Sequence, residues 1–173
     1  IVCNTDAQAL NKCDVPIKIQ LGEGLGAGTN PTEGRNAALN SQDEIAEKVL
    51  DDKTEMLFIT AGMGGGTGTG AAPVIASIAN KLGILTVGIV TMPFAFEGRK
   101  KILQAQEGVL EMKKHCDTVI VILNDKLREV LGEMTISNAF AQADNVLTTA
   151  AKSIAEIITV PGYVNVDFED VKT

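Results

Sequence analysis

Apolar residues along this chain fall into short runs that polar or glycine-rich turns separate. Four runs have the length and the β-branched content of buried strands: residues 17–21, 56–60, 84–90 and 118–123. Helical spacing of apolar positions marks four further segments: residues 41–50, 69–82, 97–114 and 124–131. Ser41, with Glu44 three residues on, predicts a capping box at the start of the first helix. The alternation predicts an α/β fold, a three-layer, Rossmann-like, mostly parallel sheet with helices on both faces.

A long central helix ends this pattern. We predict it from Ser137, a suitable N-cap residue, to about residue 159, because apolar positions step by four, three and four: Leu147, Ala151, Ile154 and Ile158. A helix of about 23 residues is roughly 34 Å long. Groups at its two ends therefore cannot meet on one ligand within one molecule.

Composition narrows the class of protein. A chain of 173 residues suits one domain. Its net charge of −7 argues against a nucleic-acid or membrane surface, and we find neither a signal peptide nor a membrane-length apolar stretch. Cys3, Cys13 and Cys116 lack a paired metal spacing, so we expect idle thiols and predict no protein metal site. We predict a cytoplasmic protein without direct membrane insertion.

Residues 62–70 form a glycine-threonine run between a predicted strand and a predicted helix. Backbone N–H groups can approach an anion closely there, and the helix adds the positive end of its dipole. The run is not a Walker loop, because it contains no lysine. Gly66, Gly68 and Ala71 fit a dinucleotide-binding fingerprint only loosely. The run predicts a phosphate site; the alternative is that its glycines only let the helix pack closely on the sheet.

Two further groups carry candidate chemistry. Glu97 beside Arg99, Lys100 and Lys101 could accept ribose hydroxyls while a cation meets phosphate, or it could be a charged helical turn facing solvent. Phe140 and Asp144 share a helix face. The ring could stack on a base and the carboxylate could accept the two adjacent donors of guanine, which adenine lacks; the alternative is a core phenylalanine near an exposed acid.

Asp167 and Asp170 follow the long helix, far from Phe140 and Asp144. They would repel a triphosphate unless a metal ion or an attacking water lay between. If both helix ends are functional, these acids serve the nucleotide of another subunit, and such head-to-tail contacts propagate into filaments. The alternative is a solvated helix cap.

Several segments together resemble the FtsZ family of bacterial tubulin homologues: residues 4–10, 24–28, 64–70, 93–98, 124–127 and 165–170. The resemblance runs over nearly all of the chain. It implies a GTPase that binds GTP or GDP with Mg²⁺ and polymerises head to tail into the division ring at mid-cell. It also implies a membrane-tethering adaptor and other division proteins as partners.

Site residues follow from the resemblance. It implies that phosphates lie against Gly66, Thr67 and Gly68, with Gly64 and Gly65 beside them, and that Glu97 holds the ribose. Phe140 and Asp144 would hold guanine, with Asn124 nearby. The nucleotide rim would include Asn4, Asp6, Ala27, Gly28 and Thr29, and Asp167 and Asp170 would polarise the attacking water across the interface.

The chain departs from the family pattern in four ways. The first strand with its phosphate loop and the C-terminal domain are expected but absent from residues 1–173, and the loop between Gly22 and Gly24 is shorter. Lys101 stands where the family commonly has arginine, so a bidentate phosphate contact would be lost. Two alternative functions remain open: an NAD-dependent oxidoreductase domain, and a structural assembly module indifferent to nucleotide.

Overall fold

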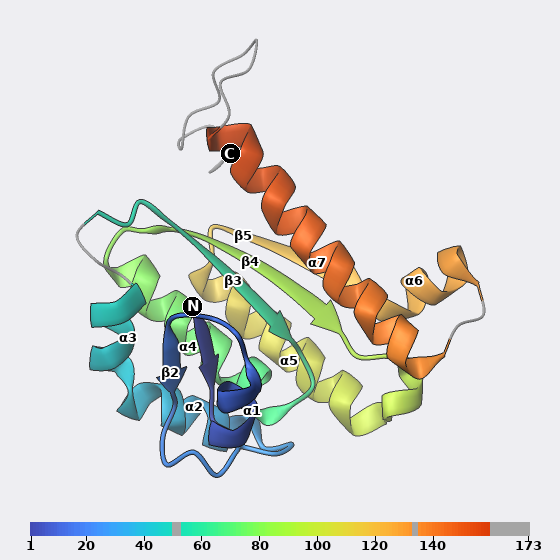
Figure 1. The fold of residues 1–173 in the computed structure, drawn as a ribbon, viewed down its shortest axis with the longest axis horizontal. Coiled ribbons are helices and arrows are strands. Elements are labelled where there is room, and N and C mark those ends of the chain that lie inside the picture. The colour runs from blue at the N-terminus through green and yellow to red at the C-terminus, as the bar shows by residue number, and fades with distance from the viewer. Residues whose placement is uncertain (50–52, 133–134, 160–173) are drawn as a thin grey trace.

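A computed structural model describes residues 1–49, 53–132 and 135–159 (Figure 1). Strands and helices alternate along the chain. The strands are β1 (Val2–Asn4), β2 (Lys18–Gln20), β3 (Met56–Gly62), β4 (Leu85–Met92) and β5 (Thr118–Leu123). The helices are α1 (Ala7–Lys12), α2 (Pro31–Asn40), α3 (Gln42–Val49), α4 (Gly66–Lys81), α5 (Arg99–His115), α6 (Asn124–Leu131) and α7 (Ile136–Thr159), with a short 3₁₀ turn at Ala95–Glu97.

All strand pairs among the described residues are parallel, as predicted, but they form two sheets. One sheet pairs β1 with β2, and the other has the order β3-β4-β5. A groove of about 370 Å³ separates β1 from β3, with Ala71, Ala72 and Ile75 of α4 among its lining residues. The facing edges of β1 and β3 therefore remain unpaired within the described part of the chain.

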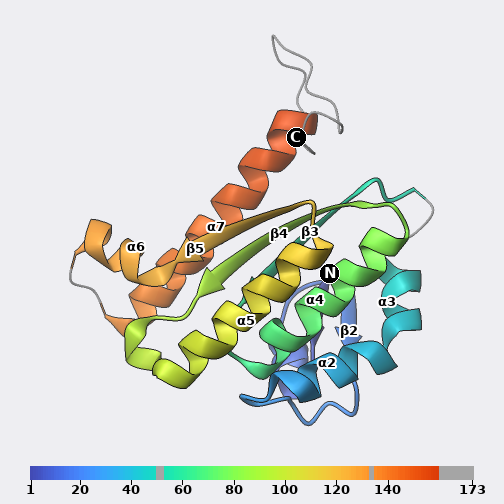
Figure 2. The ribbon, with the colours of Figure 1, turned by 180° about the vertical axis from the view of Figure 1, so that it is seen from behind.

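Helices cover both faces of the larger sheet, which confirms the three-layer α/β prediction. Helices α4 and α5 pack on one face, and α2 and α3 lie against α4 (Figure 2). Helix α7 crosses the other face over β4 and β5 and continues past the sheet (Figure 1). No helix of the described residues is long and apolar enough to cross a membrane.

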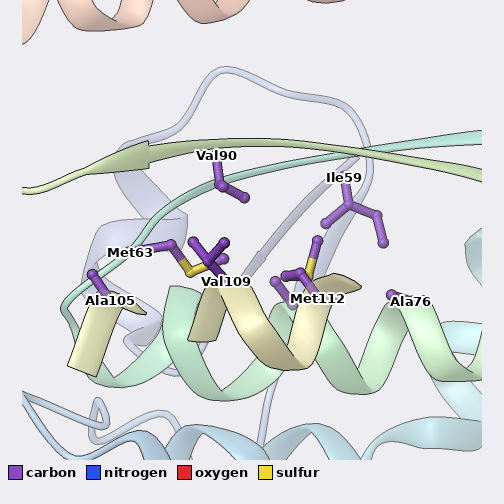
Figure 3. Close-up of a cluster of buried hydrophobic side chains, with 8 residues drawn as sticks. Ile59, Met63, Ala76, Val90, Ala105, Val109 and Met112 are labelled. Carbon is purple, nitrogen blue, oxygen red and sulfur yellow. The ribbon is translucent and has the colours of Figure 1, made fainter. Parts of the chain in front are cut away.

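The largest buried cluster lies between the sheet and its two covering helices (Figure 3). Strand β4 is buried along nearly its whole length, as its continuous apolar run requires when both faces are covered. Side chains from β3, the loop after it, β4, α4 and α5 meet there: Ile59, Met63, Ala72, Ala76, Val90, Ala105, Val109 and Met112. This core fixes the start of α4 and α5 relative to the strand ends.

Several predicted boundaries were wrong. Helices α1 and α2 were not predicted, although Asn30 caps α2 and Pro31 occupies its first position, a recognisable start signal. Helix α7 begins at Ile136, and the Thr135 hydroxyl, not Ser137, accepts the Asn138 N–H at 3.3 Å. The predicted start of the helix after the glycine run was also late, since α4 begins inside the run at Gly66.

The predicted capping box at Ser41 does not form as expected. The Ser41 hydroxyl accepts a hydrogen bond from the Gly22 N–H at 3.3 Å, and the Glu44 carboxylate pairs with Lys48 at 2.6 Å. A capping box would need the Ser41 N–H to bond the Glu44 carboxylate. This N–H is already bonded to the last carbonyls of α2, because Ser41 also ends that helix.

Candidate nucleotide site

Loops at the carboxyl ends of strands from the two sheets, β1-β2 and β3-β4-β5, come into contact at one edge of the fold. The Thr5 hydroxyl, just after β1, lies 2.7 Å from the hydroxyl of Thr67, in the first turn of α4. The Ala27 N–H donates to the same Thr5 oxygen at 2.8 Å. Because Thr5 is buried, these three residues form a fixed junction between loops that are far apart in sequence. Ligands of parallel α/β sheets bind at this edge.

The N-terminus of α4 presents free backbone donors. Gly65 is the N-cap residue, and no side chain caps the helix there. Within the described residues the N–H groups of Gly65, Thr67 and Gly68 have no hydrogen-bond partner, whereas the Gly66 N–H donates to the Gly28 carbonyl at 2.8 Å. Free N–H groups at the positive end of a helix suit an anion such as phosphate.

Close packing explains three glycines of the run. A Cβ added to Gly66 would lie 2.6 Å from the Ala27 carbonyl oxygen. A Cβ added to Gly68 or to Gly70 would lie 2.2 Å from the Gly62 carbonyl oxygen or 2.0 Å from that of Pro31. Backbone atoms cannot move aside as a flexible side chain can, so these positions require glycine. A Cβ on Gly65 would meet nothing within 4 Å. The packing interpretation of the run therefore holds for three of its glycines, while Gly65 leaves the helix end open.

Asn4 and Asp6 have clear structural roles beside Thr5. The Asp6 carboxylate accepts the N–H groups of Gln8 and Ala9 at 2.8 and 3.1 Å and so caps α1. The Asn4 side-chain oxygen accepts the Asp6 N–H at 3.1 Å. Both residues thus shape the loop at the end of β1, and their contact with a nucleotide remains a prediction.

Glu97 is held between two donors and is largely, but not fully, shielded from solvent. Its Oε1 accepts the Phe94 N–H at 2.9 Å, and its Oε2 accepts the Lys101 ammonium at 3.1 Å. The carboxylate side chain is 16% exposed. Lys101 in turn borders the glycine run, because a Cβ on Gly64, whose φ is +101°, would lie 3.0 Å from the Lys101 carbonyl. The candidate ribose residue is therefore next to the free end of α4.

Three phenylalanine rings form a cluster that the sequence analysis missed. Phe94 and Phe96 stack with ring centroids 5.0 Å apart, and Phe140 of α7 meets Phe94 edge-on at 5.2 Å. Phe94 is buried, whereas Phe96 and Phe140 are 52% and 40% exposed. The spacing of two phenylalanines around the 3₁₀ turn was the available signal. The exposed Phe140 ring thus lies beside the turn that carries Glu97.

Asn124 and Asp125 begin α6 at the end of β5. Asn124 is 4% exposed, and its side-chain oxygen is buried without a hydrogen-bond partner among the described residues. Asp125 accepts the Ala95 N–H at 3.1 Å and fixes the Phe94 turn against α6. A buried, unpaired amide oxygen is costly and suits a donor that a ligand supplies.

The remaining candidates lie on α7, after α7, and in the loop between β2 and α2. Asp144 is exposed one turn after Phe140, as predicted from their spacing. Asp167 and Asp170 lie outside the described residues. Ala27, Gly28 and Thr29 lie in the loop between β2 and α2, next to Thr67 and Gly66 through the contacts above. Contacts thus connect Phe140 through Phe94, Glu97, Lys101 and the glycine run to Thr5, and we refer to this series of contacts as the path from Phe140 to Thr5.

The half-buried thiols of Cys3 and Cys116 are chemically quiet. Burial raises the pKa of the Cys116 thiol to about 11, with the Asp117 carboxylate adding to the shift, and burial also raises the pKa of Cys3. Both thiols therefore stay protonated at neutral pH, where a thiolate is needed for nucleophilic attack or metal ligation.

We expect Cys116 to react with iodoacetamide at pH 8 about 100-fold more slowly than a free cysteine, because its thiolate fraction is that much smaller. Peptide mass spectrometry over a time course measures this rate. Modification of Cys116 as fast as free cysteine would contradict the burial of this thiol.

The model of the GTPase domain of the Tubulin/FtsZ family matches residues 1–132. The chain belongs to this family. The matched region contains every described candidate residue except Phe140 and Asp144, and it includes the whole glycine run and the Phe94–Glu97 turn.

Individual FtsZ proteins agree with the family assignment. FtsZ of Porphyromonas gingivalis is 55% identical over 178 residues, which cover 100% of this chain and 39% of that relative. FtsZ of Wigglesworthia glossinidia brevipalpis is 54% identical, covering 98% of this chain and 45% of that relative. The structure of an FtsZ dimer from M. jannaschii, described as empty, superimposes with a TM-score of 0.92 at 48% identity, covering 98% of this chain and 50% of that one. The chain thus spans less than half the length of these two curated relatives.

Proposed function

We propose that this chain binds GTP along the path from Phe140 to Thr5. The observation that carries the proposal is the order of the described groups: an exposed aromatic ring, a carboxylate, a cation and free helix N–H groups. The ring suits a base, the carboxylate suits a ribose, and the cation and the N–H groups suit a phosphate chain. Family membership of the chain supports this assignment.

Base recognition falls to Phe140, Asp144 and Asn124 in this proposal. Phe140 stacks on the base, and the edge-on contact with Phe94 fixes the orientation of the Phe140 ring. Asp144 accepts the two donors of guanine. The unpaired Asn124 oxygen accepts a further donor from the nucleotide, which would remove the cost of its burial.

Ribose and phosphates follow along the path. Glu97 accepts a ribose hydroxyl with lone pairs left over from its bonds to the Phe94 N–H and Lys101, since a carboxylate offers about four acceptor positions. Phosphate oxygens meet the free N–H groups of Gly65, Thr67 and Gly68, and Gly64, Ala27, Gly28 and Thr29 border them. Asn4 and Asp6 shape the adjoining loop.

Mg²⁺ would come with the nucleotide. Among the described residues no group of three or more His, Cys, Asp or Glu side chains could hold a metal ion. Magnesium keeps several waters and is commonly bound through substrate phosphates, so we propose that phosphate oxygens and water supply its ligands. Bound there, it would neutralise charge on the transferred phosphoryl group.

Hydrolysis requires a second subunit in this proposal. Asp167 and Asp170 of one molecule polarise the attacking water at the nucleotide of the next, which joins subunits head to tail. We propose that the resulting filament forms the bacterial division ring at mid-cell in the cytoplasm, tethered to the membrane by an adaptor and met there by other division proteins. One of the similar structures is that of an FtsZ dimer, which supports self-association.

The two alternative functions find no support. Membership in a GTPase-domain family argues against an NAD-dependent oxidoreductase built on Gly66, Gly68 and Ala71. In addition, the N–H of Gly66 is already bonded to Gly28. A structural module indifferent to nucleotide would not require free donors, a vacant amide oxygen and an exposed ring on one path.

The dependence of turnover on protein concentration tests the shared site. We expect GTP hydrolysis per molecule to rise with protein concentration and then level off as head-to-tail contacts form. Phosphate release, measured over a dilution series alongside light scattering, reports both events. A rate per molecule that does not change with concentration would contradict hydrolysis between subunits.

Asp144→Ala should reduce the preference for GTP over ATP by about tenfold to a hundredfold, because two charge-assisted hydrogen bonds to guanine are lost. Competition binding with both nucleotides measures the ratio. Glu156→Ala is the matched control, an exposed acid on the same helix, and it should leave the ratio unchanged. Unaltered discrimination in Asp144→Ala would remove this residue from base recognition.

A further inference from the structure

Gln104 links two distant parts of the candidate site. Its side-chain Nε2 donates a hydrogen bond of 2.9 Å to the backbone carbonyl of Thr29, 75 residues away in sequence. Gln104 lies on the second turn of α5, one turn after Lys101, and Thr29 lies in the loop between β2 and α2. The bond therefore fastens the β2–α2 loop to the helix that borders the glycine run.

The orientation of this amide is determined. A carbonyl oxygen can only accept, so the NH₂ group of Gln104 must face Thr29. The side-chain Oε1 then points into a buried position, where it has no partner among the described residues. A leucine of similar size would not bury this unpaired oxygen. Gln104 therefore makes the contact with the loop although burial of its unpaired Oε1 is unfavourable for folding.

Two consecutive carbonyls of the loop are pinned. The Gly28 carbonyl accepts the Gly66 N–H of α4 at 2.8 Å, and the Thr29 carbonyl accepts Gln104 of α5. The loop is otherwise exposed at these two residues and at Asn30. The Asn30 N–H donates to the Ala27 carbonyl at 2.9 Å and closes the loop. In a trans peptide the N–H points opposite to the carbonyl, so fixing the Gly28 carbonyl also fixes the direction of the Thr29 N–H.

We propose that Gln104 is a positioning residue for the phosphate side of the nucleotide. It holds residues 27–30 in the arrangement that phosphates require, and it touches neither the base nor the ribose. The proposal rests on the GTP-binding function above. It predicts that loss of the Gln104 bond weakens binding only of ligands that carry phosphates, and leaves the folded core intact.

Gln104→Leu tests this role, with Gln106→Leu as the matched control, since Gln106 is an exposed glutamine two residues away on the same helix. In the absence of nucleotide, the Asn30 and Gly66 amides should exchange with deuterium about tenfold faster in Gln104→Leu. Its GTP affinity should fall about tenfold, while guanosine affinity, measured by NMR titration, and the melting temperature should match the control.

Each other result overturns the proposal. Unchanged exchange in Gln104→Leu would show that the bond does not hold the loop. Faster exchange with unchanged GTP affinity would show that the loop does not position phosphates, and an equal loss of guanosine affinity would indicate a general structural role. If the proposed GTP-binding function itself is wrong, the wild-type protein and the Gln106→Leu control will also fail to bind GTP. That result is distinguishable from a loss of affinity confined to Gln104→Leu.

Discussion

Asp170→Ala should bind GTP as tightly as the wild-type protein and hydrolyse it at least about 100-fold more slowly. In the proposed function Asp170 acts on the nucleotide of the next subunit and contacts none in its own molecule. Binding and turnover should therefore separate in one variant. Equilibrium binding and phosphate release, measured on the same sample, give the two values.

Glu169→Ala is the control for this prediction, because it removes an adjacent acid and should change neither quantity. A complementation mixture sharpens the test. In an equal mixture of Asp144→Ala and Asp170→Ala proteins, about a quarter of random head-to-tail contacts join an intact nucleotide site to an intact acid. At a GTP concentration too low to saturate Asp144→Ala, turnover of the mixture should therefore exceed that of either variant alone. Loss of GTP binding in Asp170→Ala would contradict a role across the interface.

Gly70→Ala should destabilise the protein by about 3 kcal/mol or more, a large part of the stability of an ordinary domain. A Cβ at this position would lie 2.0 Å from the Pro31 carbonyl oxygen and 2.6 Å from the Arg35 N. Both are backbone atoms of α2, so α2 and α4 would have to separate. Urea denaturation followed by circular dichroism measures the loss.

Gly65→Ala is the comparison within the same glycine run. A Cβ there meets nothing within 4 Å, so the free energy of unfolding should fall by less than about 1 kcal/mol. Nucleotide affinity should fall instead, because a methyl group would occupy the open end of α4. Equal stability losses in the two variants would contradict the division of the run into packing and ligand-facing glycines.

The sequence pattern predicted what depends on local periodicity. Strands β3, β4 and β5 were found because each is a continuous apolar run, and β4 is buried along almost its whole length. Phe140 and Asp144 were placed on one helix face by spacing alone. The glycine run was located between a strand and a helix, although its glycines also fit the packing alternative.

Long-range contacts could not be predicted in this way. The division into two sheets depends on which strand edges meet in space, and the apolar runs carry no information about that choice. The packing of Phe140 against Phe94 and Phe96 joins α7 to a 3₁₀ turn far from it in sequence. Similarly, the bond between Gln104 and Thr29 joins a helix to a loop 75 residues earlier, and periodicity shows only that Gln104 lies on a helix.

The central claim is that one continuous path of residues binds a guanine nucleotide. Competition binding of GTP, ATP and NAD against a fluorescent GTP analogue tests it most directly. We predict that GTP displaces the analogue at concentrations at least about tenfold lower than ATP and that NAD does not displace it. Displacement by ATP or NAD as effective as that by GTP would contradict the account.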